Sequence, residues 1–182
     1  MALTSPWPWL ALLALLFFWM LGAHNRLVAL RAAILAAWNQ TDAVLKTRSQ
    51  VLIALLTAVQ TQLDGDHATL VATSAAQAAF RERWEAVRPR PVDAAPVVAL
   101  AQADAALAER LAQLVALIED WPALAVDAAV ASQLQALRDL EPRLLFARQT
   151  FNRAAWRYNE ALQQFPTRLL KPVFRFGAAG RL

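Results

Sequence analysis

The 182-residue chain contains no cysteine, only four glycines and only two histidines. A chain without cysteine forms no disulfide, no thiolate metal site and no cysteine nucleophile. The scarcity of glycine, the abundance of alanine and leucine, and the absence of alternating β-branched residues all favour helix over strand. The fold class expected from composition is therefore all-α.

Charged side chains are missing from the beginning of the chain, where no Asp, Glu, Lys or Arg precedes Arg26. The stretch from Trp7 to Ala23 is apolar apart from Pro8 and Gly22. As a helix it spans about 26 Å, and with Leu3–Pro6 it reaches the roughly 30 Å of a bilayer core. This indicates a transmembrane helix. The alternative is a cleaved signal peptide, which is disfavoured because no basic residue precedes the stretch and its cleavage site is poor.

The overall balance of residues agrees with a membrane anchor. The chain is 58% hydrophobic, with a mean hydropathy of +0.34 that is high for a purely soluble protein. Because Arg26 and Arg31 follow the apolar stretch and nothing basic precedes it, the positive-inside rule places the remainder in the cytoplasm. We therefore expect a single-pass membrane protein, with residues 1–23 as anchor and the bundle on the cytoplasmic side.

Apolar residues beyond the anchor recur at three- and four-residue steps from Leu27 to Leu63, and Arg48 interrupts this seam. No proline or glycine lies between these ends, so the pattern predicts a helix of about forty residues that continues the anchor. Three more helices are expected, which together with the first give an elongated antiparallel bundle of two long and two short helices. Their predicted ranges are 67–87, 97–120 and 127–165.

Proline and aspartate set the predicted breaks between these helices. The prolines in residues 88–96 forbid a continuous helix and indicate an exposed loop, which we prefer to the alternative of a ligand for an SH3-type groove. Asp127 is a natural N-cap for the last helix. Pro142 should kink that helix, and a boundary between two helices at this point is the alternative.

Two asparagines stand seven residues apart near the end of the last predicted helix, Asn152 and Asn159, with Arg148 one turn before them. This spacing places them on one stripe at the edge of an apolar seam. Asparagine is a weak helix former, so its presence at such an edge suggests polar contacts between helices. We predict a polar ladder facing the first helix, with a solvated edge as the alternative. Its proposed members are Asn39, Asp42, Arg48, Arg148, Asn152 and Asn159.

These residues lie in a recognisable run. The pattern F-A-R-Q-x-[FY]-N-x-A-x-x-x-Y-N-x-x-[IL]-x-x-F-P is matched from Phe146 to Pro166, and it resembles the signature of the LemA family of membrane-anchored helical proteins. A second block, at His24–Arg31, Ala37–Trp38 and Leu45–Arg48, is similar to the opening of that family. The resemblance covers most of the chain and implies a LemA-like helical bundle at residues 24–166. It implies architecture far better than activity.

Catalytic and metal-binding groups are sparse. His24 and His67 are the only histidines, and the predicted first helix separates them. Asp64, Asp66 and His67 crowd into one predicted turn without EF-hand spacing, which favours helix capping over a metal site. No Ser/His/Asp arrangement, phosphate-binding glycine loop or Glu-x-x-His pair is present. We therefore expect no enzyme activity, no catalytic residues, no cofactor and no metal.

Arginines recur every four or five residues along the last predicted helix, a pattern that prompts the hypothesis of nucleic-acid binding. Five-residue steps rotate by about 140° each, so the side chains spiral around the axis instead of forming one basic face. This pattern fits salt bridges at several helix interfaces better than a nucleic-acid surface. The arginines concerned are Arg138, Arg143, Arg148, Arg153 and Arg157.

The last predicted segment, residues 167–182, is basic and aromatic. If the long helices run up from the bilayer and back, this tail returns to the membrane, where its apolar residues enter the headgroups and its cations meet anionic lipid. The alternative is that its aromatic residues cap the bundle core. The candidate contact residues are Arg168, Leu169, Leu170, Lys171, Val173, Phe174, Arg175 and Phe176.

Taken together, these patterns predict a membrane-anchored bundle that acts as a protein-interaction or scaffold module. The expected partners are the lipid bilayer and another protein, with no nucleic acid. The sequence specifies neither that protein nor an oligomeric state. The alternative functions are a membrane-associated enzyme, which would need a convergent polar pocket, and a nucleic-acid-binding protein, which would show salt-sensitive affinity.

Overall fold

The computed structural model describes residues 7–63, 68–164 and 177–182. Within these ranges the chain forms five helices, four of them long: α1 (Trp7–Gln62), α2 (Ala68–Val87), α3 (Ala94–Asp120), α4 (Pro122–Ala125) and α5 (Ala128–Gln163). Only an isolated bridge between Asp93 and Ala179 has β character in the described part of the chain. The prediction of an all-α bundle is confirmed, with the short α4 as an addition.

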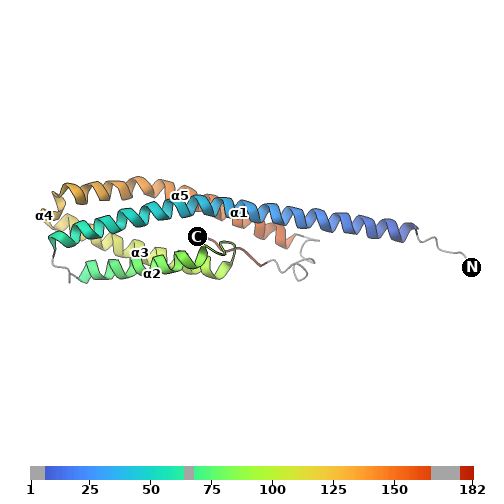
Figure 1. Cartoon of the computed structure of the whole chain (residues 1–182), viewed down its shortest axis with the longest axis horizontal. Coiled ribbons are helices and arrows are strands. Elements are labelled where there is room, and N and C mark those ends of the chain that lie inside the picture. The colour runs from blue at the N-terminus through green and yellow to red at the C-terminus, as the bar shows by residue number, and fades with distance from the viewer. Residues whose placement is uncertain (1–6, 64–67, 165–176) are drawn as a thin grey trace, which may run out of the picture.

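The helices form two antiparallel pairs. α1 packs along α5, and α2 packs along α3, with α4 closing the end of the bundle farthest from the amino terminus (Figure 1). The pairs share one apolar core, to which α1 contributes the face predicted from its periodicity, including Ile34, Leu52 and Val59. Between α1 and α5, the rings of Trp38 and Phe151 meet edge to face with centroids 6.0 Å apart, a geometry that aromatic pairs prefer.

α1 is one unbroken helix of 56 residues, and its first part projects beyond the bundle (Figure 1). Large apolar side chains on this projection are exposed, with Trp9 at 67% and Phe18 at 68%. Among the described helices, α1 alone is long and apolar enough to cross a membrane, with a window of mean hydropathy 1.5 that is almost wholly unburied. The structure is therefore consistent with a single-pass membrane protein.

Helix boundaries follow the predicted breaks with two corrections. α3 begins at Ala94 instead of residue 97, because Pro96 falls in its first turn, where no backbone N–H is needed for an intrahelical bond. α5 runs through Pro142 without a break, so the alternative of two separate helices is wrong. Asp127 caps α5 as expected, accepting hydrogen bonds from the backbone N–H groups of Ala129 and Val130 at 2.8 and 2.9 Å. The predicted turn at Asp64–Asp66 lies outside the described residues.

Candidate functional site

A buried charge cluster joins three helices in the middle of the bundle. Arg48 of α1 donates through Nη1 to Oδ1 of Asp104 on α3 at 2.7 Å, and Arg148 of α5 forms an ion pair with the other oxygen of the same carboxylate. Arg48 and Asp104 are almost fully buried, whereas the Arg148 side chain is 32% exposed. The cluster ties the α1–α5 pair to α3, because one acid is shared between two cations.

Position along the helices explains why these groups meet. Asp104 lies between Leu100 and Leu107 on the buried face of α3, and Arg48 interrupts the apolar seam of α1 between Leu45 and Leu52. Residues four and three apart share a helical face, so each charged group must point into the core. A buried charge requires a partner, and the shared carboxylate supplies it.

Burial perturbs both guanidinium groups. The pKa of Arg48 is lowered mainly by desolvation, and the nearby carboxylate of Glu141 partly opposes this. The pKa of Arg148 is lowered by desolvation first and then by the positive charge of Arg48. Two like charges are therefore held close together in a poorly solvated place, and the acid between them offsets their repulsion.

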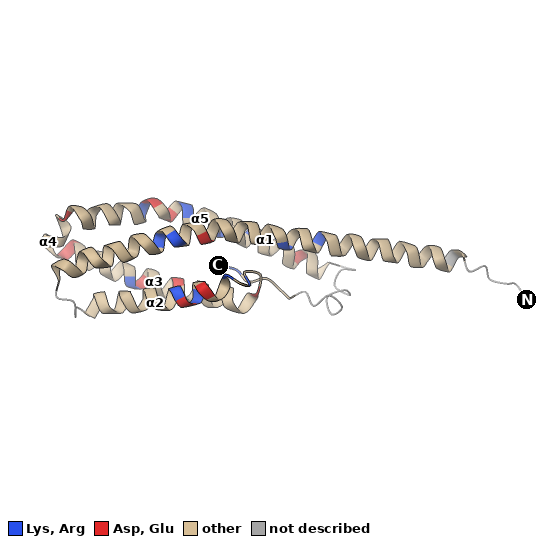
Figure 2. Ribbon diagram, viewed as in Figure 1, with Lys and Arg blue, Asp and Glu red and all other residues tan. Residues whose placement is uncertain are grey.

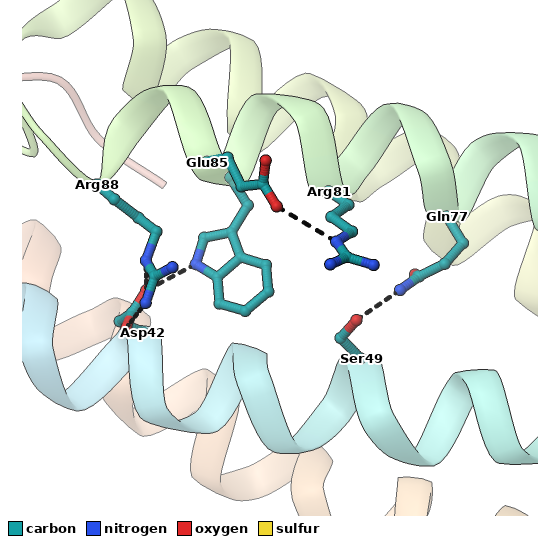
Figure 3. A network of polar contacts seen from close by, with 7 residues as sticks. Asp42, Ser49, Gln77, Arg81, Glu85 and Arg88 are labelled. Carbon is teal, nitrogen blue, oxygen red and sulfur yellow. Dashed lines mark hydrogen bonds and ion pairs between the residues drawn. The ribbon is translucent and has the colours of Figure 1, made fainter.

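A second set of polar contacts joins α1 to α2 and to Arg88, the residue that follows α2 (Figure 3). Trp84 donates through its indole Nε1 to Oδ1 of Asp42 at 2.8 Å, and Nε of Arg88 lies 3.3 Å from the same oxygen. Farther along the interface, Gln77 donates through Nε2 to Oγ of Ser49 at 2.8 Å. These bonds fix the register of α2 against α1, because each requires one particular pair of positions to be opposed.

The carboxyl-terminal segment, residues 177–182, is held by the two asparagines of α5. Asn159 donates through Nδ2 to the carbonyl of Ala179 at 2.9 Å and accepts from the N–H of the same residue at 2.8 Å. Asn152 does the same with Leu182, at 2.7 and 2.8 Å. Each side-chain amide thus satisfies one backbone donor and one backbone acceptor, as a neighbouring strand would.

The spacing of the two asparagines along α5 matches the spacing of the two residues that they bind. Seven residues of helix rise by about 10.5 Å, and three residues of extended chain cover about 10 Å. Asn152 and Asn159 are therefore as far apart as Leu182 and Ala179, the residues that they bind, and the segment runs antiparallel to α5. Both amides are therefore satisfied at once by backbone groups of this one segment.

The opposite side of the segment contacts the beginning of α3. Ala179 forms its isolated bridge with Asp93, and both Ala179 and Gly180 are buried. A Cβ atom added at Gly180 would lie 2.7 Å from Cβ of Val97 and 2.9 Å from the carbonyl oxygen of Ala94. Only glycine fits at this point, because the neighbouring atoms include backbone that cannot move aside.

Comparison with known proteins identifies the family of the chain. A model of the LemA family matches residues 37–181, which is most of the chain. The chain belongs to the LemA family. No curated protein matches it at a significant level. In this LemA chain, the polar residues of the run at 146–166 have distinct contacts: Arg148 binds the buried acid, and the two asparagines bind the carboxyl-terminal segment.

The predicted polar ladder is wrong about the partners of its two asparagines. Asn152 and Asn159 do not face α1, because they lie at the edge of the buried face of α5 and bind residues 177–182 instead. Asp42 faces α2, and Asn39 lies exposed on α1. The structure does bring Arg48 and Arg148 to one carboxylate. The candidate membrane-contact residues, 168–171 and 173–176, lie outside the described residues.

A cavity of about 190 Å³ adjoins the charge cluster where the carboxyl-terminal segment reaches it. Its charged wall is formed by Arg48, Asp104, Glu141 and Arg148, and its apolar wall includes Phe80 and Leu182.

The sequence analysis did not identify Asp104 or the segment at 177–182 as part of the site. For Asp104 a signal existed, since an acid spaced four and three residues from two seam leucines must be buried; for the segment, no periodicity indicates its position.

Proposed function

We propose that this LemA-family protein is a membrane-anchored interaction module, in which α1 fixes the bundle to a bilayer and the outer surface of α5 binds another protein. The observation that carries the proposal is the exposure of large apolar residues on α5: Leu145 at 58%, Phe146 at 67% and Trp156 at 53%. Tryptophan and other aromatic residues are enriched where proteins bind one another.

The position of these residues supports a surface role. Leu145 and Trp156 are eleven residues apart, which is about three helical turns, so they share one face of α5. Asn152, which binds the carboxyl-terminal segment, lies on the same side of α5. The buried stripe that contains Phe151 and Tyr158 lies on the other side. A partner on this face would cover exposed apolar area without disturbing the core.

Charge and contact patterns support attachment at the start of the bundle. Charged residues lie along the bundle, and the projecting part of α1 has none before Arg26 (Figure 2). Arg26 donates to Oε1 of Gln164 at 3.2 Å, so the end of α5 lies where the apolar stretch of α1 ends. We propose from this that residues 168–176 contact the membrane surface and, from the positive-inside rule, that the bundle is cytoplasmic.

Site-directed photo-crosslinking in cells tests the interaction. A photoreactive residue at Trp156 should give a discrete protein adduct that resists nuclease treatment, and Leu145→Ser in the same chain should weaken it. The control position is Glu119, which is exposed on α3. If positions 145, 146 and 156 give no adduct beyond the level at Glu119, the proposed interaction surface is wrong.

The membrane contact is tested separately. Because the chain has no cysteine, Phe174→Cys provides a unique site for an environment-sensitive dye in the full-length protein in vesicles. Lipid-borne quenchers should quench the dye at position 174 and spare a dye at Glu109→Cys on α3. Equal quenching at the two positions would refute the contact.

A further inference from the structure

The surface that holds residues 177–182, between α5 and the beginning of α3, has the properties of a peptide-binding groove. Asn152 and Asn159 contact only backbone atoms of the segment in the bonds described above. Backbone contacts of this kind hold any extended chain, whatever its side chains, and they underlie recognition by strand addition. Here two helix-borne amides replace the edge of a sheet.

Selectivity comes from the wall opposite the amides. The Ala179 position is buried, and the Gly180 position admits no Cβ because of Val97 and the Ala94 carbonyl. Arg181 is exposed, so its position tolerates any residue. Leu182 contributes to the wall of the cavity beside Phe80 and the charge cluster, where an apolar side chain fits. The groove therefore selects the pattern small, glycine, any residue, apolar.

We propose that this groove binds an extended segment of a partner protein with the pattern small-Gly-x-apolar, and that residues 177–182 occupy it as an internal competitor. The proposal rests on the interaction function proposed above and names a site for it. A tethered segment competes at an effective concentration set by its linker, which is in the millimolar range for short flexible linkers. A partner segment must therefore exceed the internal segment in affinity, or bind when that segment is released.

Glycine substitutions allow the internal segment to be released in the full-length protein. Gly180→Val should eject it, because the added Cβ meets Val97 and Ala94. Gly177→Val is the matched control, since an added Cβ there has nothing within 4 Å. Ala179→Pro is a second releasing variant, because proline lacks the N–H that Asn159 accepts. Hydrogen exchange of the Leu182 amide reports release, and circular dichroism reports the intact bundle.

The probe is a fluorescent synthetic peptide of residues 177–182, measured by anisotropy against each chain in detergent micelles. The Gly180→Val or Ala179→Pro chain should bind it at least about tenfold more tightly than the wild type or Gly177→Val. Adding Asn152→Ala and Asn159→Ala to a releasing variant should abolish binding, and a peptide carrying the Gly180→Val change should not bind.

Three results would overturn the proposal. One is a released chain that does not bind the peptide, another is binding that is unaffected by loss of both asparagines, and the third is a Leu182 amide that stays protected in both releasing variants. The third would make the segment a fixed part of the fold. Because the probe is the chain's own sequence, this assay reports on the groove alone, whereas failure of the proposed function would appear as missing adducts in the crosslinking experiment.

Discussion

Removing the shared carboxylate should destabilise the bundle more than loss of any surface charge. Asp104→Ala leaves Arg48 buried with only 7% of its side chain exposed, and leaves Arg148 without its ion-pair partner. Breaking a buried pair by removing one partner costs about 3–5 kcal/mol. Arg148 is 32% exposed and can regain water, so the cost comes mainly from Arg48 and we expect the lower end, about 3 kcal/mol.

The measurement is thermal and urea unfolding of the full-length protein in detergent, followed by circular dichroism. A loss of about 3 kcal/mol should lower Tm by roughly 6–12 °C in a chain of this size. The matched control is Glu109→Ala, an exposed acid on the same helix, which should stay within about 0.5 kcal/mol of the wild type. Replacing Arg48 with Met in an Asp104→Leu background should recover part of the loss, because it removes the unpaired buried cation. An Asp104→Ala chain within about 1 kcal/mol of the wild type would refute a net role for the pair.

Four other predictions follow from single features. Asn152→Ala should cost about 1–3 kcal/mol by leaving the Leu182 backbone unpaired, whereas the exposed Gln149→Ala should be neutral in the same unfolding assay. Burial raises the pKa of Tyr158 above its ordinary 10.0, so the phenol ionises first in the unfolded chain. As pH rises past 10.0, the stability measured by urea unfolding should therefore fall more in the wild type than in Tyr158→Phe. Asp127→Ala should lower stability by about 0.5–2 kcal/mol through loss of its two capping bonds, and an equal midpoint would show that the cap is dispensable. The wild type should stay in the membrane pellet after an alkaline wash, and deletion of residues 1–22 should release a helical protein; a soluble wild type would contradict the anchor.

The helices and their buried faces were readable from sequence because periodicity is a local property. Leu27, Ile34, Leu52 and Val59 recur at helical spacing and all lie in the core. The N-cap at Asp127 was likewise visible, since a cap acts on the two or three residues that follow it. Pro142 was harder to interpret, because the packing of a 36-residue helix can retain a proline that local rules would place at a boundary.

The partners of the polar residues could not be read in the same way. Asn152 and Asn159 were correctly placed at the edge of a buried stripe, but the stripe does not say which segment lies beside it. The residues that Asn152 and Asn159 bind lie 30 and 20 residues later in the sequence, respectively. Both belong to residues 177–182, which have no periodic pattern. Asp104 had a local signal in its leucine neighbours, yet its two arginine partners depend on how three helices assemble.

The unbroken α1 has a mechanical consequence if its first turns anchor the protein in a membrane as proposed. From Arg26 to its end at Gln62, α1 extends about 54 Å inside the bundle, and the same rigid rod continues through the proposed span. A tilt of about 20°, the average for transmembrane helices, would therefore swing the far end of the bundle sideways by almost 20 Å. If α1 is anchored as proposed, the tilt of its span would therefore set the lateral position of the distal end of the bundle, whereas the height of that end above the membrane would change little.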